Sequence, residues 1–230
     1  MNMKRKPPTG NVRPVISLGN NFRGVTTNKQ SHLVQFESEQ ERKLILLLER
    51  DPLVQDYVSQ PETLTFIDEK GRQRRYTPDF QVWHVNGQIE LHEVTVQSRR
   101  ESHNSLPERE VAAQLICQQR GWQYVVHTDQ TLPLGFEYSS LDFLSAFRAQ
   151  CYAEVESADW WEGKLQGQGQ VHPRFVINQM EQNLKADVLL SNLYNMLWRG
   201  KVEMNWHQPF FWQGDFHPQA RIWLPEGGVP

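Results

Sequence analysis

The segment at residues 89–97, which follows the dipeptide Asn86-Gly87, constrains the fold of this chain most strongly. Asn-Gly between two runs of strand-forming residues is the strongest short signal for a tight β-hairpin, because both residues tolerate positive φ angles. Side chains alternate between the two faces of a strand, so Glu93 shares one face with aliphatic residues. A carboxylate there costs free energy unless it is paired, hydrogen-bonded or bound to a cation. One face of the strand comprises Ile89, Leu91, Glu93, Thr95 and Gln97.

Helix and strand signals around this hairpin follow the order helix, three strands, helix, strand. The first helix begins after Ser38, which stands three residues before Glu41 in the spacing of a capping box, and it ends at Asp51-Pro52. The second helix has Ser105 as its N-cap and Pro107 in its first turn, and Gly121 ends it. The predicted strands are residues 54–67, 73–85, 88–97 and 122–127. This order predicts an α/β domain with a mixed sheet flanked by helices.

The second half of the chain has a different pattern. Helical periodicity is present at residues 139–154, 173–185 and 187–199, and a Gly/Gln-rich link occupies residues 163–170. Short apolar stretches at residues 202–206, 210–212 and 222–224 then predict a small β-hairpin. Helices followed by a hairpin are typical of a winged-helix-like module, although other helical hairpins give a similar pattern.

Basic residues are concentrated at the N-terminus. Residues 1–36 hold six of the 24 Lys and Arg residues and none of the 27 Asp and Glu residues. A basic, Pro- and Gly-containing arm favours contact with phosphates, and a solubilising disordered tail is the alternative. We expect residues 1–30 to form an extended arm. The residues expected to contact DNA are Lys4, Arg5, Lys6, Arg13, Arg23 and Lys29 in this arm, and Arg72, Arg74, Arg75, Arg99 and Arg100 in the body.

The rest of the composition is that of an ordinary globular protein. No apolar run approaches the ~18–20 residues that span a bilayer, and the charged N-terminus is not followed by an apolar segment. The two cysteines, Cys117 and Cys151, have no metal-binding spacing. We therefore expect a protein of the bacterial cytoplasm.

Two further acidic residues complete a possible site. Glu41 lies on the same helical face as the apolar Leu44, Ile45 and Leu48, but for this residue alone capping of the helix is the stronger explanation. Asp79 follows Pro78 at the opening of a strand, where a simple turn is the alternative. Gln60-Pro61 either positions Gln60 near these residues or forms a turn. A divalent cation shared by Asp79 and Glu93 would offset their charge, and Mg²⁺ accepts such oxygen ligands.

Taken together, the helix glutamate, the Pro-Asp pair and the strand glutamate resemble the PD-(D/E)xK nuclease superfamily. The flanking motifs resemble the TnsA family, the endonuclease subunits of heteromeric cut-and-paste transposases. The resemblance spans roughly residues 22–212. The motifs are Phe36-Glu37-Ser38, Glu41-Arg42, Asp51-Pro52-Leu53-Val54, Gln60-Pro61, Tyr76-Thr77-Pro78-Asp79-Phe80, Glu93-Val94 and Leu197-Trp198-Arg199-Gly200.

This resemblance implies a restriction-endonuclease-like core at residues 31–137 and a winged-helix-like, partner-binding domain at residues 138–230. It implies Mg²⁺- or Mn²⁺-dependent cleavage of the 5′ ends of the transposon in double-stranded DNA. An integrase-fold transposase would act on the 3′ ends, and an AAA+ regulator would dock on the C-terminal domain. Glu41, Asp79 and Glu93 would be acidic ligands, with the Val94 carbonyl as a further ligand.

The chain departs from the family pattern at Thr95, which stands where the family has its catalytic lysine. A threonine hydroxyl makes hydrogen bonds but carries no positive charge. Gln97 shares the predicted face of Thr95 and is a candidate to hold a water. No lysine is a convincing substitute, since Lys43 lies two positions from Glu41 on the helix and points away from it. An inactive DNA-binding scaffold and a stand-alone restriction or repair nuclease therefore remain alternatives to a transposition endonuclease.

Overall fold

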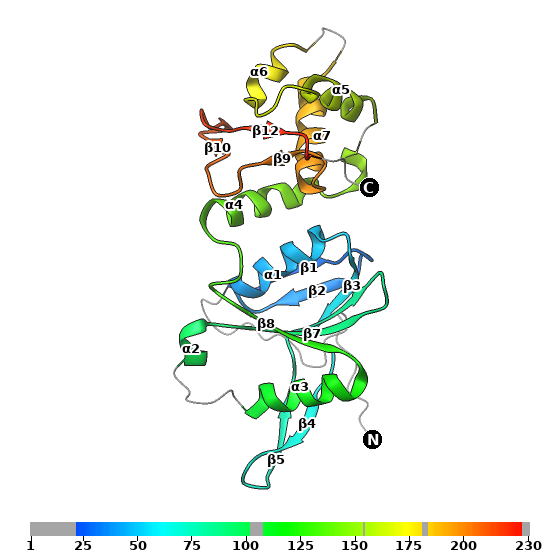
Figure 1. Ribbon diagram of the computed structural model, residues 1–230, viewed down its shortest axis with the longest axis vertical. Coiled ribbons are helices and arrows are strands. Elements are labelled where there is room, and N and C mark those ends of the chain that lie inside the picture. Colours follow the sequence, from blue (N-terminus) through cyan, green and yellow to red (C-terminus); the bar gives the residue numbers. More distant parts are fainter. Residues whose placement is uncertain (1–21, 102–107, 154, 181–183, 227–230) are drawn as a thin grey trace. The chain divides into compact units, whose positions relative to one another are not determined.

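The structure is a computed structural model that describes residues 22–101, 108–153, 155–180 and 184–226. The chain divides into two compact units, Met1–Leu132 and Pro133–Pro230, and each is described separately (Figure 1). No helix among the described residues is long and apolar enough to cross a membrane.

The first unit is built on a four-stranded sheet in the order β3-β6-β7-β8. Neighbouring strands are antiparallel except β7 and β8, which are parallel. The helices α1 and α3 lie on opposite sides of this sheet (Figure 1). In chain order the elements are β1 (Gly24–Thr27), β2 (Leu33–Phe36), α1 (Glu39–Arg50), β3 (Val54–Ser59), β4 (Leu64–Ile67), β5 (Gln73–Tyr76), β6 (Phe80–His84), β7 (Ile89–Thr95), α2 (Gln97–Glu101), α3 (Glu108–Arg120) and β8 (Gln123–Thr128).

A mixed sheet flanked by helices confirms the predicted α/β class and fits a restriction-endonuclease-like core. Each face of the sheet has its own apolar core, because inward-facing strand residues meet an amphipathic helix on either side. The core beside α1 includes Leu44, Ile45 and Phe80, and the core beside α3 includes Leu91 and Cys117. Glu93 therefore lies in a sheet that is covered on both faces, Asp79 lies immediately before β6, and Glu41 lies on α1.

The predicted start of α1 is confirmed. Ser38 has an extended backbone, with φ −147° and ψ 161°, and its hydroxyl accepts a hydrogen bond from the Glu41 N–H. Leu44, Ile45 and Leu48 are buried as the apolar stripe requires, and the helix ends at Arg50 before Asp51. The Asn86-Gly87 turn is also confirmed, since it joins the antiparallel strands β6 and β7 and Gly87 has φ 85°.

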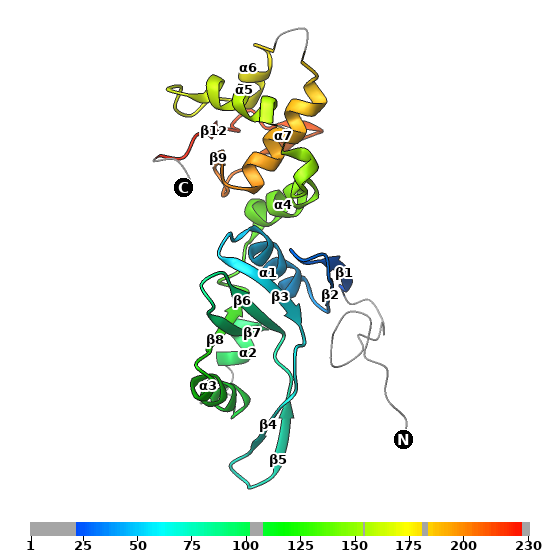
Figure 2. The ribbon, with the colours of Figure 1, turned by 90° about the vertical axis from the view of Figure 1, so that its right-hand side faces the viewer.

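Two predicted strands are each divided in the structure. The segment 54–67 forms β3 and β4, because Gln60 adopts φ 49° immediately before Pro61 and turns the chain. The segment 73–85 forms β5 and β6, which Pro78 separates, since proline has no N–H for a ladder. The strands β4 and β5 pair with each other and form a separate hairpin that extends from the main sheet (Figure 2).

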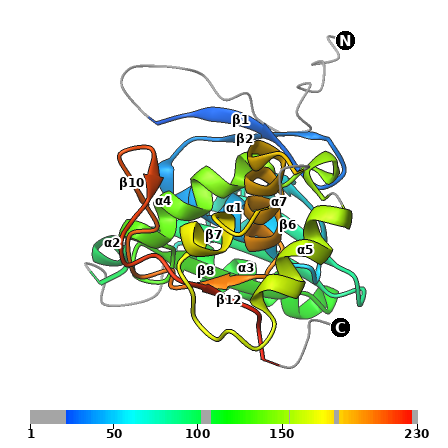
Figure 3. The ribbon, with the colours of Figure 1, turned by 90° about the horizontal axis from the view of Figure 1, so that it is seen from above.

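The prediction that residues 1–30 form an extended arm does not hold at the C-terminal end of this segment. Residues 24–27 form β1, which pairs with β2 in an antiparallel hairpin, and the two strands run side by side (Figure 3). Alternating β-branched residues and a polar turn made the hairpin possible, but the glycines around it favoured a loop. Residues 1–21, and with them Lys4, Arg5, Lys6 and Arg13, lie outside the described residues.

The predicted strand 88–97 is shorter than expected. It ends at Thr95, and Gln97 begins α2, so Gln97 and Arg99 do not share a strand face with Glu93. This corrects the expected alignment of Gln97 with Thr95: the Gln97 N–H donates to Asp129 Oδ1 at 2.7 Å, which turns the chain out of the sheet. The predicted cap Ser105 and Pro107 lie outside the described residues, and α3 is described from Glu108.

The second unit consists of helices followed by very short strands. Its longest helix is α7, whose buried residues include Leu193 and Trp198. The predicted helix at residues 139–154 is shorter and continues as two 3₁₀ turns, and the one at 173–185 is a single short helix. The sequence did not predict α5, which buries Trp161. The elements are α4 (Gly135–Leu144), α5 (Val155–Leu165), α6 (Pro173–Ile177), α7 (Ala186–Trp198), β9 (Glu203–Met204), β10 (Phe211–Trp212), β11 (Asp215–Phe216) and β12 (Ile222–Trp223).

Two antiparallel pairs complete this unit, β10 with β11 and β12 with β9. Helices followed by a hairpin were predicted, and this order is present. The identification as a winged-helix module stays a prediction.

Candidate active site

Asp79 lies immediately before β6 and is held against the backbone of β7. Its N–H donates to the His92 carbonyl at 3.1 Å, and its Oδ2 accepts from the Val94 N–H at 2.7 Å. Its own carbonyl accepts from the Gln60 N–H at 2.7 Å. These contacts orient the carboxylate, so Asp79 is more than the residue of a simple turn.

Glu93 is buried in the middle of the sheet, with 5% of its surface exposed. Its Oε2 accepts a 2.5 Å hydrogen bond from the Tyr76 hydroxyl, and its Oε1 lies 3.2 Å from Arg109 Nη2. The carboxyl group of Asp79 also lowers the pKa of Glu93 as a hydrogen-bond partner, so the two carboxyl groups lie close to each other.

Burial raises the pKa of Glu93, and the charge of Glu110 adds to the effect. The Tyr76 hydroxyl, Arg109 and the hydrogen bond with Asp79 act in the opposite direction. The net shift of the Glu93 pKa is upward, because the loss of hydration on burial raises the pKa more than these partners lower it.

Tyr76 and Tyr124 extend this network. Their hydroxyl oxygens are 3.0 Å apart. The single proton of Tyr76 is donated to Glu93, so Tyr124 donates to Tyr76. Burial raises the pKa of both phenols, and the adjacent Glu93 charge contributes. Both tyrosines therefore remain neutral donors at physiological pH.

Glu41 caps α1 and also lies near Asp79. Its Oε1 accepts from the Ser38 hydroxyl at 3.0 Å and its Oε2 from the Glu37 N–H at 2.9 Å, so it caps α1. Burial raises the pKa of Glu41 from 4.5 to about 7, and the charge of nearby Asp79 is the next largest cause. The fold therefore brings Glu41 close enough to Asp79 for the two charges to repel.

Gln60 is a further residue of this region. It is buried in the left-handed conformation, which is rare for a residue with a side chain. Its Nε2 donates to Glu37 Oε1 at 3.2 Å, and its Oε1 is buried without a hydrogen-bond partner. An unsatisfied buried oxygen beside the Asp79 backbone is an acceptor for water or a cation. Of its two predicted roles, the structure supports both, since Gln60 forms the turn and lies beside Asp79.

The position of the missing lysine is occupied by Thr95, the last residue of β7, which pairs with Thr128 on β8. Lys43 is buried on α1, and its Nζ lies 3.9 Å from Glu39. The side chain of Gln97 is hydrogen-bonded to Glu101 at 3.0 Å within α2. Lys43 and Gln97 therefore each have an acidic partner on their own helix.

Several residues expected to contact DNA have partners within the first unit. The Nε atoms of Arg72 and Arg74 each lie 2.9 Å from Asp68 Oδ2. Arg100 pairs with the buried Glu110 at 3.1 Å, and the ammonium of Lys29 donates to backbone carbonyls, including that of Val54 at 2.7 Å. Arg75 and Arg99 are exposed, and Arg23 is half-buried. Contact of these residues with DNA stays a prediction.

Sequence reasoning missed Tyr76, Tyr124 and Arg109. Tyr76 stood in the Tyr-Thr-Pro-Asp motif, which was a signal. No sequence signal indicated Arg109, because it is on α3, sixteen positions after Glu93. Only the packing of that helix against the sheet brings its guanidinium to the carboxylate.

The described residues contain no group of three or more His, Cys, Asp or Glu side chains in a ready metal-binding arrangement. The donor chemistry nevertheless fits a hard divalent cation. Asp79, Glu93 and Glu41 offer carboxylate oxygens, the charges of Asp79 and Glu41 repel each other, and Gln60 offers an oxygen that has no hydrogen-bond partner among the described residues. A cation would offset the repulsion that now raises the pKa of Glu41.

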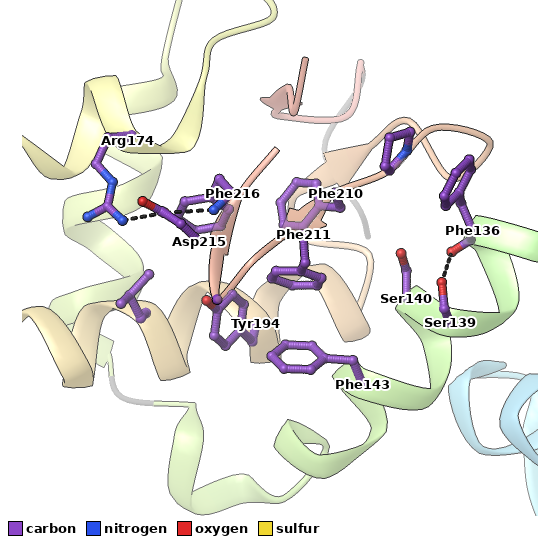
Figure 4. Close-up of a pocket in the computed structure, with 13 residues that line it drawn as sticks. Phe136, Ser139, Ser140, Phe143, Arg174, Tyr194, Phe210, Phe211, Asp215 and Phe216 are labelled. Atoms are coloured by element: carbon purple, nitrogen blue, oxygen red, sulfur yellow. Dashed lines mark hydrogen bonds and ion pairs between the residues drawn. The ribbon is translucent and has the colours of Figure 1, made fainter. Parts of the chain in front are cut away.

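The second unit contains a pocket of about 440 Å³ lined mainly by aromatic residues from α4, α7, β10 and β11 (Figure 4). Tyr194, Phe143 and Phe211 form its wall, and their rings contact one another. Its two charged residues, Arg174 and Asp215, form an ion pair with each other. This pocket offers apolar surface, whereas the first unit offers the grouped acidic residues.

A known family model matches part of the first unit. Residues 51–129 match the family model described as TnsA-like endonuclease N terminal. Asp79, Glu93, Thr95 and Arg109 lie within the matched residues, and Glu41 lies before them. No curated protein matches the chain. The match confirms the TnsA-like assignment that the motifs indicated, and it points to a nuclease of the transposase type that acts on DNA.

Proposed function

We propose that this chain, whose residues 51–129 match the TnsA-like endonuclease domain, is the subunit of a heteromeric DNA transposase that hydrolyses a phosphodiester at the 5′ ends of the transposon. The observation that carries the proposal is the proximity of the carboxyl groups of Asp79 and Glu93, with Glu41 close enough to repel Asp79. Three neighbouring carboxylates, one on α1, one immediately before β6 and one on β7, favour metal-dependent hydrolysis.

Asp79 and Glu93 would hold a Mg²⁺ or Mn²⁺ ion, with the Val94 carbonyl and Glu41 as further ligands. When bound, such an ion stabilises the negative charge that develops on the phosphate. The chain's own residues keep the ligands in position. The Val94 N–H orients Asp79, the phenol of Tyr76 orients Glu93, and the Ser38 cap orients Glu41.

The partners belong to the same proposal. An integrase-fold transposase would cut the 3′ ends, and an AAA+ regulator would bind the second unit. Exposed aromatic residues of that unit support a protein partner, since Phe136 and Phe143 are 50% and 41% exposed.

The test is a transposition reaction reconstituted with the two partner proteins on a plasmid that carries the transposon ends. Asp79→Asn keeps the shape of the side chain and an acceptor for the Val94 N–H, but removes the charge. We expect 5′-end cleavage to fall at least about 100-fold in Mg²⁺, with 3′-end cleavage preserved. Asp159→Asn is the matched control, because Asp159 is exposed on α5. Equal cleavage by Asp79→Asn and the unmodified chain would contradict the proposed site.

A second candidate function is an inactive DNA-binding scaffold, which Thr95 favours because it supplies no cation. That function predicts 3′ nicks alone and cointegrate products, and clean excision that depends on Glu41 would exclude it. A stand-alone nuclease would instead cut the plasmid without the partner proteins.

A further inference from the structure

Arg109 is the cation that contacts the acidic site. It belongs to the first turn of α3, and its Nη2 is 3.2 Å from Glu93 Oε1. Its guanidinium also lies over the ring of Tyr76, 5.8 Å from the ring centre. A carboxylate and an aromatic face thus hold the guanidinium from two directions. The guanidinium therefore lies on the face of the sheet to which the Glu93 side chain points.

The side chain is positioned by these contacts without being enclosed. Arg109 is 46% exposed, whereas the carboxylate it pairs with is 7% exposed. A guanidinium has five N–H donors in a planar fork, so one N–H can bond to Glu93 while others bond to a second anion. The half-exposed end can therefore meet a phosphate that approaches Glu93 from solvent.

Three other basic residues of the first unit have acidic partners of their own. Arg100 pairs with Glu110, Arg120 with Glu62, and the Nζ of Lys43 lies near Glu39. The charge of Arg109 also lowers the pKa of Glu93. The chain therefore has a positive charge at the site although Thr95 supplies none.

We propose that Arg109 contacts the phosphate that is cleaved and supplies the positive charge that Thr95 lacks. This inference rests on the proposed function. On this view Arg109 keeps its contact with Glu93 and donates its remaining N–H groups to the phosphate oxygens, where negative charge increases in the transition state. The alternative is that Arg109 only neutralises Glu93 and stabilises the fold.

The first measurement is the rate of 5′-end cleavage in the reconstituted reaction. Removing one donor to a transition-state oxyanion typically lowers the rate by about 100- to 1,000-fold, so we expect that loss for Arg109→Ala. Arg120→Ala is a matched control. Arg120 is at the other end of α3, pairs with Glu62, and lies over the ring of Trp122 at 4.8 Å. It combines the same two contacts away from the site and should cleave normally.

The second measurement is binding, which separates the phosphate contact from a structural role. DNA affinity is measured with Ca²⁺ in place of Mg²⁺, on duplexes with a normal phosphodiester or a neutral methylphosphonate at the position cut by the unmodified chain. We expect Arg109→Ala to weaken binding of the phosphodiester duplex about 10-fold, the scale of one charged contact, and to leave the methylphosphonate duplex unaffected. Arg109→Gln, which keeps most of the side-chain volume, is a second variant if alanine lowers the melting temperature.

The third measurement is rescue. Thr95→Lys restores a cation at the family position, so cleavage by Thr95→Lys with Arg109→Ala should exceed that of Arg109→Ala alone by at least about 10-fold. Normal cleavage by Arg109→Ala, with Asp79→Asn inactive, would overturn the inference and leave the proposed function standing. Loss of cleavage with equal effects on both duplexes would also overturn it, in favour of a structural role. No 5′ cleavage by the unmodified chain would instead contradict the proposed function.

Discussion

The hydroxyl of Tyr76 donates a 2.5 Å hydrogen bond to Glu93, although the two residues belong to different sheets. Tyr76 ends β5, in the hairpin that extends from the main sheet, and Glu93 lies on β7. The contact links the position of the β4–β5 hairpin to the orientation of a proposed ligand. Disturbing this one bond should therefore affect both the stability of the first unit and the acidity of the site.

Tyr76→Phe tests that link. The substitution removes a hydrogen bond to a carboxylate, and we expect the first unit to lose about 1.5–3 kcal/mol. The pKa of Glu93 should rise further, because the lost bond lowers it. Any cleavage should then shift to higher pH. Tyr57→Phe is the control, since its hydroxyl donates to Glu49 at 2.9 Å outside the site. A pH profile that moves equally in both variants would contradict the link.

The raised pKa of Glu41 predicts how the stability of the folded chain depends on pH. Its pKa is about 7 in the folded chain and 4.5 in its ordinary state, so the folded chain binds more protons between these values. Stability therefore falls as pH rises through this window, by about 3 kcal/mol for this group alone. Glu41→Gln removes the titration. Urea unfolding in metal-free buffer at pH 4.5 and 8 should show a smaller fall in the variant, and parallel curves would refute the assignment.

Mg²⁺ should oppose this effect if Glu41 faces a cation. Saturating Mg²⁺ at pH 8 should raise the unfolding free energy of the unmodified chain more than that of Glu41→Gln. Equal stabilisation of the two chains would show that Glu41 acts only as the cap of α1.

Arg100 tests whether a predicted DNA contact is structural. It pairs at 3.1 Å with Glu110, which is fully buried. Arg100→Met leaves a buried carboxylate without its partner, so we expect a loss of about 3–5 kcal/mol. The exposed Arg99 is the matched control, and Arg99→Met should cost less than about 0.5 kcal/mol. Lower DNA affinity with unchanged thermal stability in Arg100→Met would restore the DNA-contact prediction.

Gly24 tests the packing of the N-terminal hairpin. It pairs with Phe36 across β1 and β2, and a Cβ placed on it would lie 2.3 Å from that ring. Gly24→Ala should therefore destabilise the first unit by about 1–3 kcal/mol. Gly163→Ala is the control, because Gly163 is in helix α5 with open space around its Cα, and alanine should stabilise that helix by about 0.5–1 kcal/mol. Equal melting temperatures for the Gly24 variant and the unmodified chain would mean that Phe36 moves aside freely.

Local patterns in the sequence were enough for the order of the main elements. Ser38 marked the start of α1, and Asn86-Gly87 marked the β6–β7 turn, because capping and tight turns depend on a few neighbouring residues. The same patterns did not show that Gln60 and Thr77-Pro78 divide two strands, or that Gln97 leaves the sheet. Those changes depend on backbone angles and on a long-range bond to Asp129.

For the site, the sequence by itself determined that Glu41 and Glu93 share faces with apolar residues and hence need partners, and its Pro-Asp pair indicated Asp79. Only the tertiary structure decided who those partners are. Asp79 meets the β7 backbone, Tyr76 reaches Glu93 from another sheet, and α3 brings Arg109 across sixteen positions of sequence. Such contacts come from strand pairing and helix packing, which local sequence periodicity does not encode.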